Sequence, residues 1–191
     1  MKRTPSDLTT LINRWFDGDR EVEQELWSAL ERELRTVLAS VLWRFRRHHT
    51  LEPADLLGEL YLKLDHRTGL HFATRAHFFA YASDVLRSFL IDYERTHRRR
   101  PQGRDRTTIS TSIPGVTGER SISAIVVDDL LQRLAGRSPR AARIVHLRVF
   151  GGLTQEEVSK VGGWSLSTIK RDETAAHAWL RRQFAQGGHC D

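Results

Sequence analysis

Apolar side chains recur along most of this chain at the spacing of α-helices. Over residues 20–47 they fall three or four positions apart, while the positions between them alternate Glu and Arg. Such spacing gives each helix one apolar stripe for a protein core. The pattern predicts a first helix from Ser6 or Asp7 to Phe16, ended by Asp-Gly-Asp at 17–19, and a second helix over residues 20–47.

Two more helices are predicted before residue 100. Pro53 suits the first position of a helix, and the leucines up to Leu64 share one face. After a loop at 65–69, an aromatic and basic helix is expected over about residues 75–98. The helical period of that segment assigns the following side chains to the core: Phe78, Tyr81, Val85, Phe89 and Leu90.

The chain changes character near residue 99. The stretch that follows is rich in Pro, Gly, Ser, Thr and charged residues and has no helical period. We interpret residues 100–121 as a linker between two helical domains, a larger one over 1–99 and a smaller one over 122–186. Alternating strand patterns are nearly absent apart from 122–127, so the predicted fold is all-α.

The smaller domain begins with two predicted helices. One starts near Ser123, carries an apolar face of Val and Leu, and ends at Gly136. The next is opened by the Ser-Pro pair at 138–139. The segment over residues 151–172 follows these two helices directly.

Residues 151–172 predict a helix-turn-helix. Thr154 and Glu157 have the spacing of a capping box, in which each side chain accepts a hydrogen bond from the other residue's backbone N–H. The glycine pair at 162–163 ends this first helix, because glycine reaches left-handed backbone angles cheaply. Ser165 is placed to cap the second helix.

The second helix of this motif has a polar outer face. Ile169 is expected to face inward, and the side chains expected to face out are Ser167, Thr168, Lys170 and Arg171. Such side chains near a helix N-terminus can reach base edges and phosphates in a major groove. The alternative is a helical hairpin with a solvated basic face.

Composition agrees with a nucleic-acid partner without proving one. The net charge is +6, and most of the positive charge is Arg, which favours bidentate contacts with phosphate and guanine. The single cysteine, Cys190, allows no disulfide framework and fits a reducing compartment. With no apolar leader and no run long enough to span a membrane, we expect a cytoplasmic protein without membrane insertion.

The helix expected at 75–98 combines aromatic rings with cations, a pairing that suits unstacked nucleic acid. The terminal Arg run also fits a solvated helix end beside the helix dipole. The side chains expected to be exposed there are His77, Arg87, Ser88, Asp92, Arg95, Thr96, Arg98 and Arg99.

The helix that starts at Pro53 carries acidic residues near its beginning. Glu52 precedes the helix, and Asp55 and Glu59 share one face at i, i+4. Acids in a first turn are favoured by the helix dipole alone. On a basic protein, an acidic patch is also what a basic protein partner would recognise.

In this order the segments resemble an RNA polymerase sigma factor of the extracytoplasmic-function (ECF) group of the sigma-70 family. Residues 51–64 (LEPADLLGELYLKL) resemble region 2.2, and residues 78–92 (FFAYASDVLRSFLID) resemble regions 2.3 and 2.4. Residues 138–158 (SPRAARIVHLRVFGGLTQEEV) and 168–182 resemble region 4 and are the more specific match. The resemblance covers most of the chain.

The resemblance implies promoter DNA and core RNA polymerase as partners, the latter through its β′ clamp helices and β flap, with no cofactor, no metal and no catalysis by this chain. Bases flipped from the opening duplex would lie beside residues 75–79. For the −35 element, the implied DNA-binding residues are Ser165, Ser167, Thr168, Lys170 and Arg171. For the −10 element, they are His77, Arg87, Asp92, Arg95, Arg98 and Arg99. The implied polymerase-binding residues are Glu52, Asp55 and Glu59.

One departure from the family pattern concerns regulation. Many ECF members carry Asp-x-Glu-Asp at the start of region 2.2, but the matching residues here are Glu52-Pro-Ala-Asp55, so Ala54 lacks the usual charge. Some branches with a depleted patch are activated by a Ser/Thr kinase. Thr50 is therefore a candidate phosphorylation site, since a phosphate would restore negative charge beside a helix N-terminus. Thr50 is equally suited to a cap or a loop. An anti-sigma factor is the other regulator that the resemblance allows.

Three alternatives stay open on sequence alone. An enzyme is disfavoured, because the nine histidines lack a helix-face ligand set such as His-Glu-x-x-His, and no phosphate loop or nucleophile elbow occurs. A stand-alone transcription regulator would bind its DNA site tightly without polymerase. A pure interaction module, such as a helical anti-sigma protein, would show no salt-dependent DNA contact.

Overall fold

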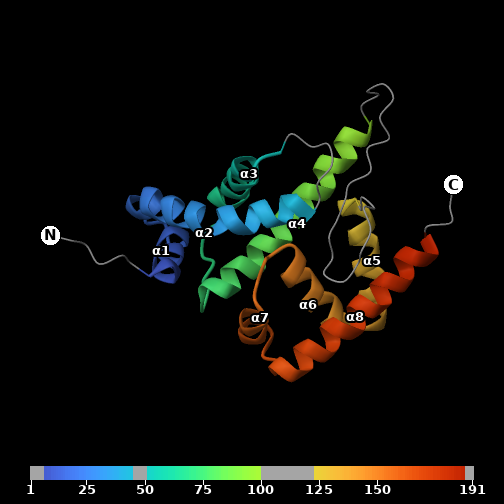
Figure 1. Cartoon of the computed structure of the whole chain (residues 1–191). Helices are drawn as coiled ribbons and strands as arrows, with labels where there is room; N and C mark the ends of the chain where they lie inside the picture. Colours follow the sequence, from blue (N-terminus) through green and yellow to red (C-terminus); the bar gives the residue numbers. More distant parts are fainter. Residues whose placement is uncertain (1–6, 45–50, 100–122, 188–191) are drawn as a thin grey trace.

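A computed structural model gives the fold of residues 7–44, 51–99 and 123–187 (Figure 1). Regular structure in these ranges is helical throughout, as predicted. The first helices are α1 (Leu8–Phe16), the single 3-10 turn η1 (Arg20–Val22), α2 (Glu23–Arg44), α3 (Pro53–Asp65) and α4 (Arg75–Arg99). We call them the N-terminal half. The C-terminal half comprises α5 (Ala124–Arg137), α6 (Pro139–Val149), α7 (Gln155–Gly162) and α8 (Leu166–Gly187).

Most helices begin at a side chain that satisfies a free backbone N–H. Ser123 Oγ accepts the Val126 N–H at 3.1 Å at the start of α5, and Ser138 Oγ accepts the Ala141 N–H at 3.4 Å at the start of α6. At α3, Asp55 Oδ2 accepts the Glu52 N–H at 2.7 Å, and Pro53 occupies the first turn. These local contacts explain why the helix starts follow so closely from sequence.

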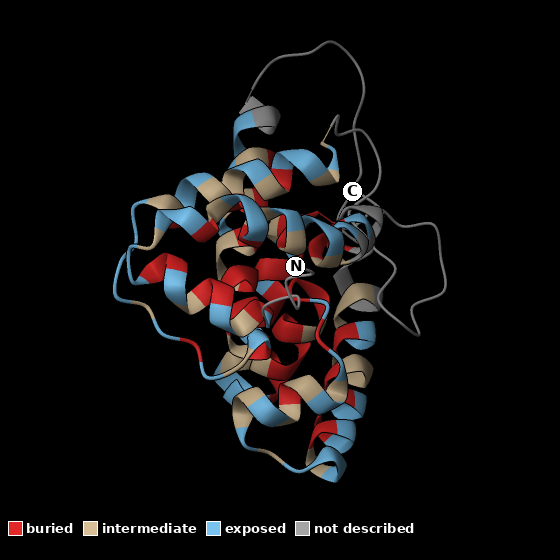
Figure 2. Cartoon of the chain, turned by 90° about the vertical axis from the view of Figure 1, so that its left-hand side faces the viewer, coloured by how far each residue is buried: buried red, intermediate tan, exposed pale blue. Residues whose placement is uncertain are grey.

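The core of the N-terminal half lies between α4 and helices α1–α3. Aromatic rings meet there edge to face, with Trp15 against Phe16 at 4.9 Å and Phe72 against Phe78 at 5.5 Å between centroids. Figure 2 shows the buried residues gathered along the inner sides of these helices. Fully buried side chains of this core include Leu11, Ile12, Leu30, Leu34, Leu56 and Leu60.

The side chains assigned to the core of α4 are only partly correct. Phe78 and Leu90 are buried, but Tyr81, Val85 and Phe89 are half-buried at the edge of the packed surface. The helix instead buries small residues such as Ala76, Ala80 and Ala82. Because α4 is covered by other helices on two sides, its buried surface extends beyond one amphipathic stripe to these small residues.

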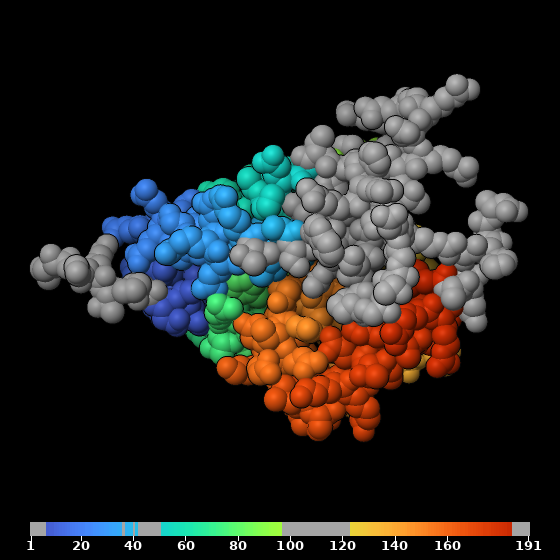
Figure 3. Space-filling model, in the orientation of Figure 1, coloured from blue at the N-terminus to red at the C-terminus, as the bar shows by residue number. Residues whose placement is uncertain are grey.

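The two halves pack against each other along α4. Its first turns lie against α7, its middle against α6 and its later turns against α5. Figure 3 shows α7, in orange, beside the green start of α4. The predicted linker at 100–121 and Thr50 lie outside the described residues, so the division into separate domains stays a prediction.

Candidate nucleic-acid interface

The helix-turn-helix forms with the contacts that its sequence predicts. Thr154 Oγ1 accepts the Glu157 N–H at 3.2 Å, and Glu157 Oε2 accepts the Thr154 N–H at 2.8 Å. Gly163 ends α7 in the left-handed conformation at φ 67°. In the turn, Ser159 Oγ donates to the Trp164 carbonyl at 2.6 Å, which ties α7 to the residue before the next cap. The angle between α7 and α8 is therefore set by local hydrogen bonds.

Helix α8 exposes one side of its first two turns, where Thr168 is half-buried. Ser165 Oγ accepts the Thr168 N–H at 3.2 Å and lies 3.0 Å from Ser167 Oγ. Ile169 is fully buried beneath this face, whereas Lys170 and Arg171 are exposed. Hydroxyl groups and cations thus gather at the positive end of the helix dipole, the arrangement that suits DNA phosphates and base edges.

Acidic side chains hold the back of α8 in place. Asp172 Oδ2 accepts a hydrogen bond from Arg140 Nε at 2.6 Å, and Glu173 accepts hydrogen bonds from Arg148 at 3.1 Å and Gln155 at 2.6 Å. The hydrogen bond from Arg140 lowers the pKa of Asp172 despite partial burial. These pairs orient α8 relative to α6 and α7. The sequence analysis missed them, although two adjacent acids within a basic helix were a signal.

The outward side of α4 matches part of the predicted −10 set. Asp92 and Arg95 are exposed, and Thr96 Oγ1 donates to the Asp92 carbonyl at 2.9 Å. His77 is half-buried, with its Nδ1 2.9 Å from Thr74 Oγ1. The side chains of the two predicted arginines beyond Thr96, Arg98 and Arg99, lie outside the description.

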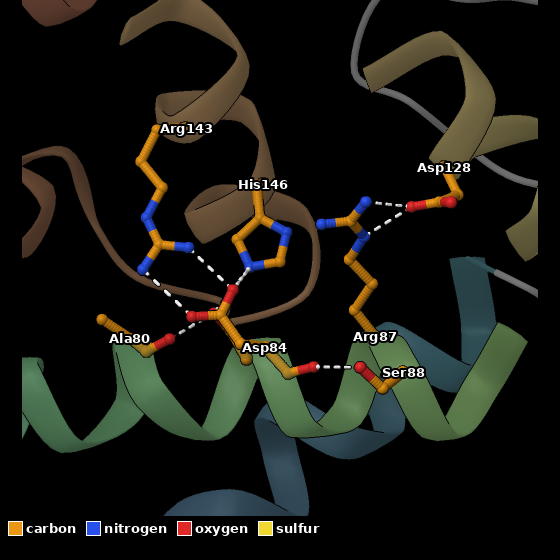
Figure 4. Close-up of polar contacts among 8 residues, drawn as sticks. Ala80, Asp84, Arg87, Ser88, Asp128, Arg143 and His146 are labelled. Atoms are coloured by element: carbon orange, nitrogen blue, oxygen red, sulfur yellow. Dashed lines mark hydrogen bonds and ion pairs between the residues drawn. The ribbon is translucent and has the colours of Figure 1, made fainter. Parts of the chain in front are cut away.

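Arg87 is not the exposed side chain that the sequence predicts. Its Nε donates to Asp128 Oδ1 of α5 at 2.6 Å, and its Nη2 pairs with the same oxygen (Figure 4). The Arg87 side chain is 30% exposed and the Asp128 side chain only 10%. The helical period places Arg87 away from the N-terminal core, but it could not show that α5 covers this side.

A second cluster lies one turn earlier on α4 (Figure 4). Asp84 accepts two hydrogen bonds from Arg143, at 2.8 and 3.2 Å, and its Oδ1 is 2.9 Å from His146 Nε2. His146 Nε2 also lies 2.9 Å from Ser83 Oγ, whose own proton goes to the Ala80 carbonyl at 2.6 Å. The imidazole therefore carries its proton on Nε2, which donates, while the buried Nδ1 has no partner.

The pKa values of this cluster follow from its burial. Burial lowers the pKa of His146, and the Asp84 carboxylate opposes that effect only in part. Burial alone would raise the pKa of Asp84, but the hydrogen bonds from His146 and Arg143 outweigh it and lower the pKa to about 2. The pair is therefore a neutral imidazole beside a carboxylate near pH 7.

The predicted polymerase-binding acids lie on α3, beside a groove between α2 and α3. Glu52 and Asp55 are exposed, and Glu59 is half-buried with Lys63 Nζ 3.7 Å away. Ala54 lines the groove. The other lining residues are Arg20, Glu21, Glu23, Gln24, Trp27, Ser28, Glu31, Leu57, Gly58 and Tyr61. The groove is therefore lined by the apolar surfaces of Trp27, Leu57 and Tyr61 and by three glutamates, Glu21, Glu23 and Glu31.

Two absences concern only the residues at 7–44, 51–99 and 123–187. No cluster of three His, Cys, Asp or Glu side chains there is arranged to hold a metal ion. No helix in the same ranges is long and apolar enough to cross a bilayer.

Comparison with known families decides between the alternatives. The family model described as "ECF sigma factor" matches residues 5–186, which is nearly the whole chain. The chain belongs to the ECF sigma factor family. It is therefore a transcription-initiation factor whose family partners are core RNA polymerase and promoter DNA. Searches of curated proteins and of solved structures gave no match.

The segments that resemble the two conserved regions of this family lie in different halves of this sigma factor. The segments that resemble region 2 form α3 and α4, and those that resemble region 4 form α6, α7 and α8. The family supports a binding protein rather than an enzyme. It does not assign roles to individual residues, so the site residues stay predictions.

Proposed function

We propose that this sigma factor directs core polymerase to a two-part promoter, with α8 at the −35 element and α4 at the −10 element. The observation that carries the proposal is the exposed, capped N-terminal face of α8, with Ser167, Lys170 and Arg171 pointing away from a buried Ile169. A helix end of this kind enters a major groove and contacts base edges with its first residues. Initiation by polymerase takes place in the cytoplasm, where we place the protein.

The −35 assignment is tested by transcription in vitro with an Arg171→Ala variant. Removing an arginine that contacts a base lowers DNA affinity by about 1–3 kcal/mol, or roughly thirtyfold at the middle of that range. Arg137→Ala is the matched control, because Arg137 is an exposed arginine at the end of α5. We expect Arg171→Ala to lose transcription from a −35-dependent promoter and to keep polymerase binding. Normal transcription by Arg171→Ala contradicts the assignment.

For polymerase we propose docking through α3 and the groove between α2 and α3. Glu52 and Asp55 offer exposed negative charge, and the glutamates of the groove add to it. The basic β′ clamp helices fit a surface of this charge. A Glu52→Lys, Asp55→Lys variant should lose co-elution with core polymerase and keep binding to DNA. Retained co-elution would move the docking surface elsewhere.

Phosphorylation of Thr50 is a finer proposal on the same surface. The groove beside α3 holds Ala54 where the family pattern has a glutamate. A phosphate a few residues before α3 would add nearly two negative charges near the helix N-terminus. Co-elution with core polymerase by Thr50→Glu but not by wild type supports a kinase switch. Equal and tight co-elution by both proteins removes the need for one.

The stand-alone regulator is the second candidate, and the complete helix-turn-helix in the C-terminal half is compatible with it. It predicts tight, salt-dependent promoter binding by the purified protein without polymerase. Failure of both wild type and Thr50→Glu to co-elute with polymerase, together with such DNA binding, would select this candidate over the sigma function.

A further inference from the structure

One apolar side chain lies exposed within the proposed DNA-binding face. Leu166, the first residue of α8, is 38% exposed and lies between the cap Ser165 and the exposed Ser167. Among the described residues, the other large apolar side chains that are exposed are Leu62 of α3 and Val126 of α5. Single exposed leucines are common on protein surfaces, so the surroundings of Leu166 matter more than its exposure alone.

The apolar packing of the helix-turn-helix is made by residues other than this leucine. Val161 and Trp164 pack against the core, and Ile169 is fully buried beneath α8. The Trp164 ring also covers Gly162, where an added Cβ would overlap it. Trp164 directly precedes the cap and Ile169 is the fourth residue of the helix, the two positions that a hydrophobic staple uses. Leu166 therefore remains at the surface while its neighbours hold the turn together.

The hydroxyl groups on either side of Leu166 are engaged with one another. Ser165 Oγ accepts the Thr168 N–H at 3.2 Å. The same oxygen lies 3.0 Å from Ser167 Oγ and 2.9 Å from Thr168 Oγ1. A hydroxyl group both donates and accepts, so it discriminates weakly between bases. Leucine has no donor or acceptor, and against a polar base edge it would leave buried atoms without partners. It therefore favours a base that offers an apolar group.

Thymine presents such a group in the major groove, the C5-methyl group. Lys170 lies one turn after Leu166 on the same face of α8, and both are exposed. Side chains at this spacing are about 5–6 Å apart, which corresponds to one or two base-pair steps of about 3.4 Å. Lys170 and Arg171 place positive charge beside the leucine, so its surroundings complement the charge of DNA.

We propose that Leu166 is a specificity-determining residue, and that its side chain contacts the C5-methyl group of a thymine in the −35 element. The inference rests on the proposed −35 role of α8 and deepens it, because it adds a base preference to a face otherwise made of hydroxyl groups and cations. This thymine lies one or two base pairs from the base pair nearest Lys170.

The test begins by selecting the DNA that the protein prefers. Duplexes randomised across both promoter elements are bound by the full-length protein with core RNA polymerase, and the bound fraction is sequenced. The variants are Leu166→Ala, which removes most of the apolar side chain, and Leu166→Met, which keeps one of similar size. Val126→Ala is the matched control, because Val126 is an exposed apolar residue of α5, outside the recognition helix.

We expect the wild type, Leu166→Met and the control to select thymine at one position of the −35 element. Leu166→Ala should lose the preference at that position and keep the preferences at neighbouring positions. Identical selected sequences for Leu166→Ala and the wild type overturn the inference.

Deoxyuridine then tests the contact with the methyl group itself. Replacing the selected thymine by deoxyuridine removes that group and keeps the base pair. The wild type should bind the deoxyuridine duplex about fourfold more weakly, the effect expected for one buried methyl group. Leu166→Ala should bind the two duplexes equally. A merely structural role of Leu166 predicts weaker binding of Leu166→Ala to both duplexes with the ratio of the wild type, and that result overturns the contact.

The outcomes also separate this inference from the proposed function. Arg171→Ala should weaken binding to the thymine and deoxyuridine duplexes alike. If that loss occurs while the wild type binds both duplexes equally, the −35 role of α8 stands and the role of Leu166 is wrong. If Arg171→Ala selects and binds DNA as the wild type does, the −35 assignment of α8 fails, and the inference on Leu166 fails with it.

Discussion

Two helices of this sigma factor carry cations that we propose contact DNA, and the two sets of cations have different surroundings in the structure. The first turns of α8 expose Lys170 and Arg171, although Arg171 Nε lies 3.5 Å from Asp172 Oδ1. Asp172 and Glu173 also accept hydrogen bonds from Arg140 and Arg148 of α6, which hold the helix. On α4, Arg87 is bound by an acid from the other half of the chain. The comparison teaches that a basic helix is available to DNA only when its cations have no stronger intramolecular partner.

The difference also has an energetic side. The Arg143–Asp84 pair is well exposed on both sides, so by itself it adds little to stability. Asp128 is nearly buried, and a buried carboxylate that loses its cation is strongly penalised. We therefore expect the Arg87–Asp128 contact to stabilise the packing of α5 on α4 more than the Arg143–Asp84 pair stabilises the packing of α6.

The largest expected effect comes from removing the support of the exposed helix. Ile169→Ala deletes a fully buried side chain beneath the recognition face, which should lower the free energy of unfolding by about 2–5 kcal/mol. Leu166→Ala, three residues earlier and 38% exposed, is the control and should change it far less. Urea denaturation measures both, and equal losses would contradict the packing of α8.

A pair of arginine variants tests the comparison directly. Arg171→Ala should weaken binding of the free protein to a −35 fragment by about 1–3 kcal/mol and leave the free energy of unfolding nearly unchanged. Arg87→Ala should lower the free energy of unfolding by roughly 1–3 kcal/mol, because it leaves the Asp128 carboxylate without its cation. Fluorescence anisotropy and urea denaturation give the two readouts. An Arg87→Ala variant of wild-type stability would show that the pair does not form.

A smaller effect is expected from the capping box that sets the turn before α8. Thr154→Ala removes the acceptor for the Glu157 N–H and should cost about 0.5–2 kcal/mol of stability. Thr154→Ser keeps the hydroxyl and should restore most of that loss. Thermal unfolding distinguishes the two, and indistinguishable midpoints would mean that the cap contributes nothing.

The smallest effect is a pH dependence of the surface between the halves. The pKa of His146 is lowered on folding, so its contribution to stability is present above about pH 6.5 and falls as the pH drops below that value. Asp84 adds a second loss, which begins as the pH falls through the ordinary value of 3.8 and is complete below its own pKa of about 2. Arg143, Arg87 and Ser83 face the imidazole.

The check is urea denaturation at pH 7.5 and pH 5.5. His146→Gln should show a weaker loss of stability at pH 5.5 than wild type. The pKa of His177 is lowered too, also mainly by burial, so a slope from that residue remains in both proteins. The same slope in wild type and His146→Gln would contradict a neutral, buried His146.

Most of the local structure could be predicted from sequence because its determinants are neighbours in the chain. Each of these determinants affects only the adjacent helical turn. Helix α7 begins at the Thr154–Glu157 capping box and ends at Gly163, and α3 begins at Pro53, as the sequence predicts. The exposed face of α8 followed from the same short-range pattern. Family membership then identified promoter DNA as a partner, and the contact through that face stays a proposal.

Which cations of α4 are exposed depends on the tertiary structure. Helical period distinguishes a side that faces the nearest core from a side that does not, and on that basis Arg87 was expected in solvent. Asp128 lies 41 residues further along the chain, and its approach depends on how two separately patterned helix groups pack. Local sequence thus determined which helices form and where their cations lie, whereas long-range packing decided which cations are free, because the energy of an ion pair depends on a partner that no local pattern specifies.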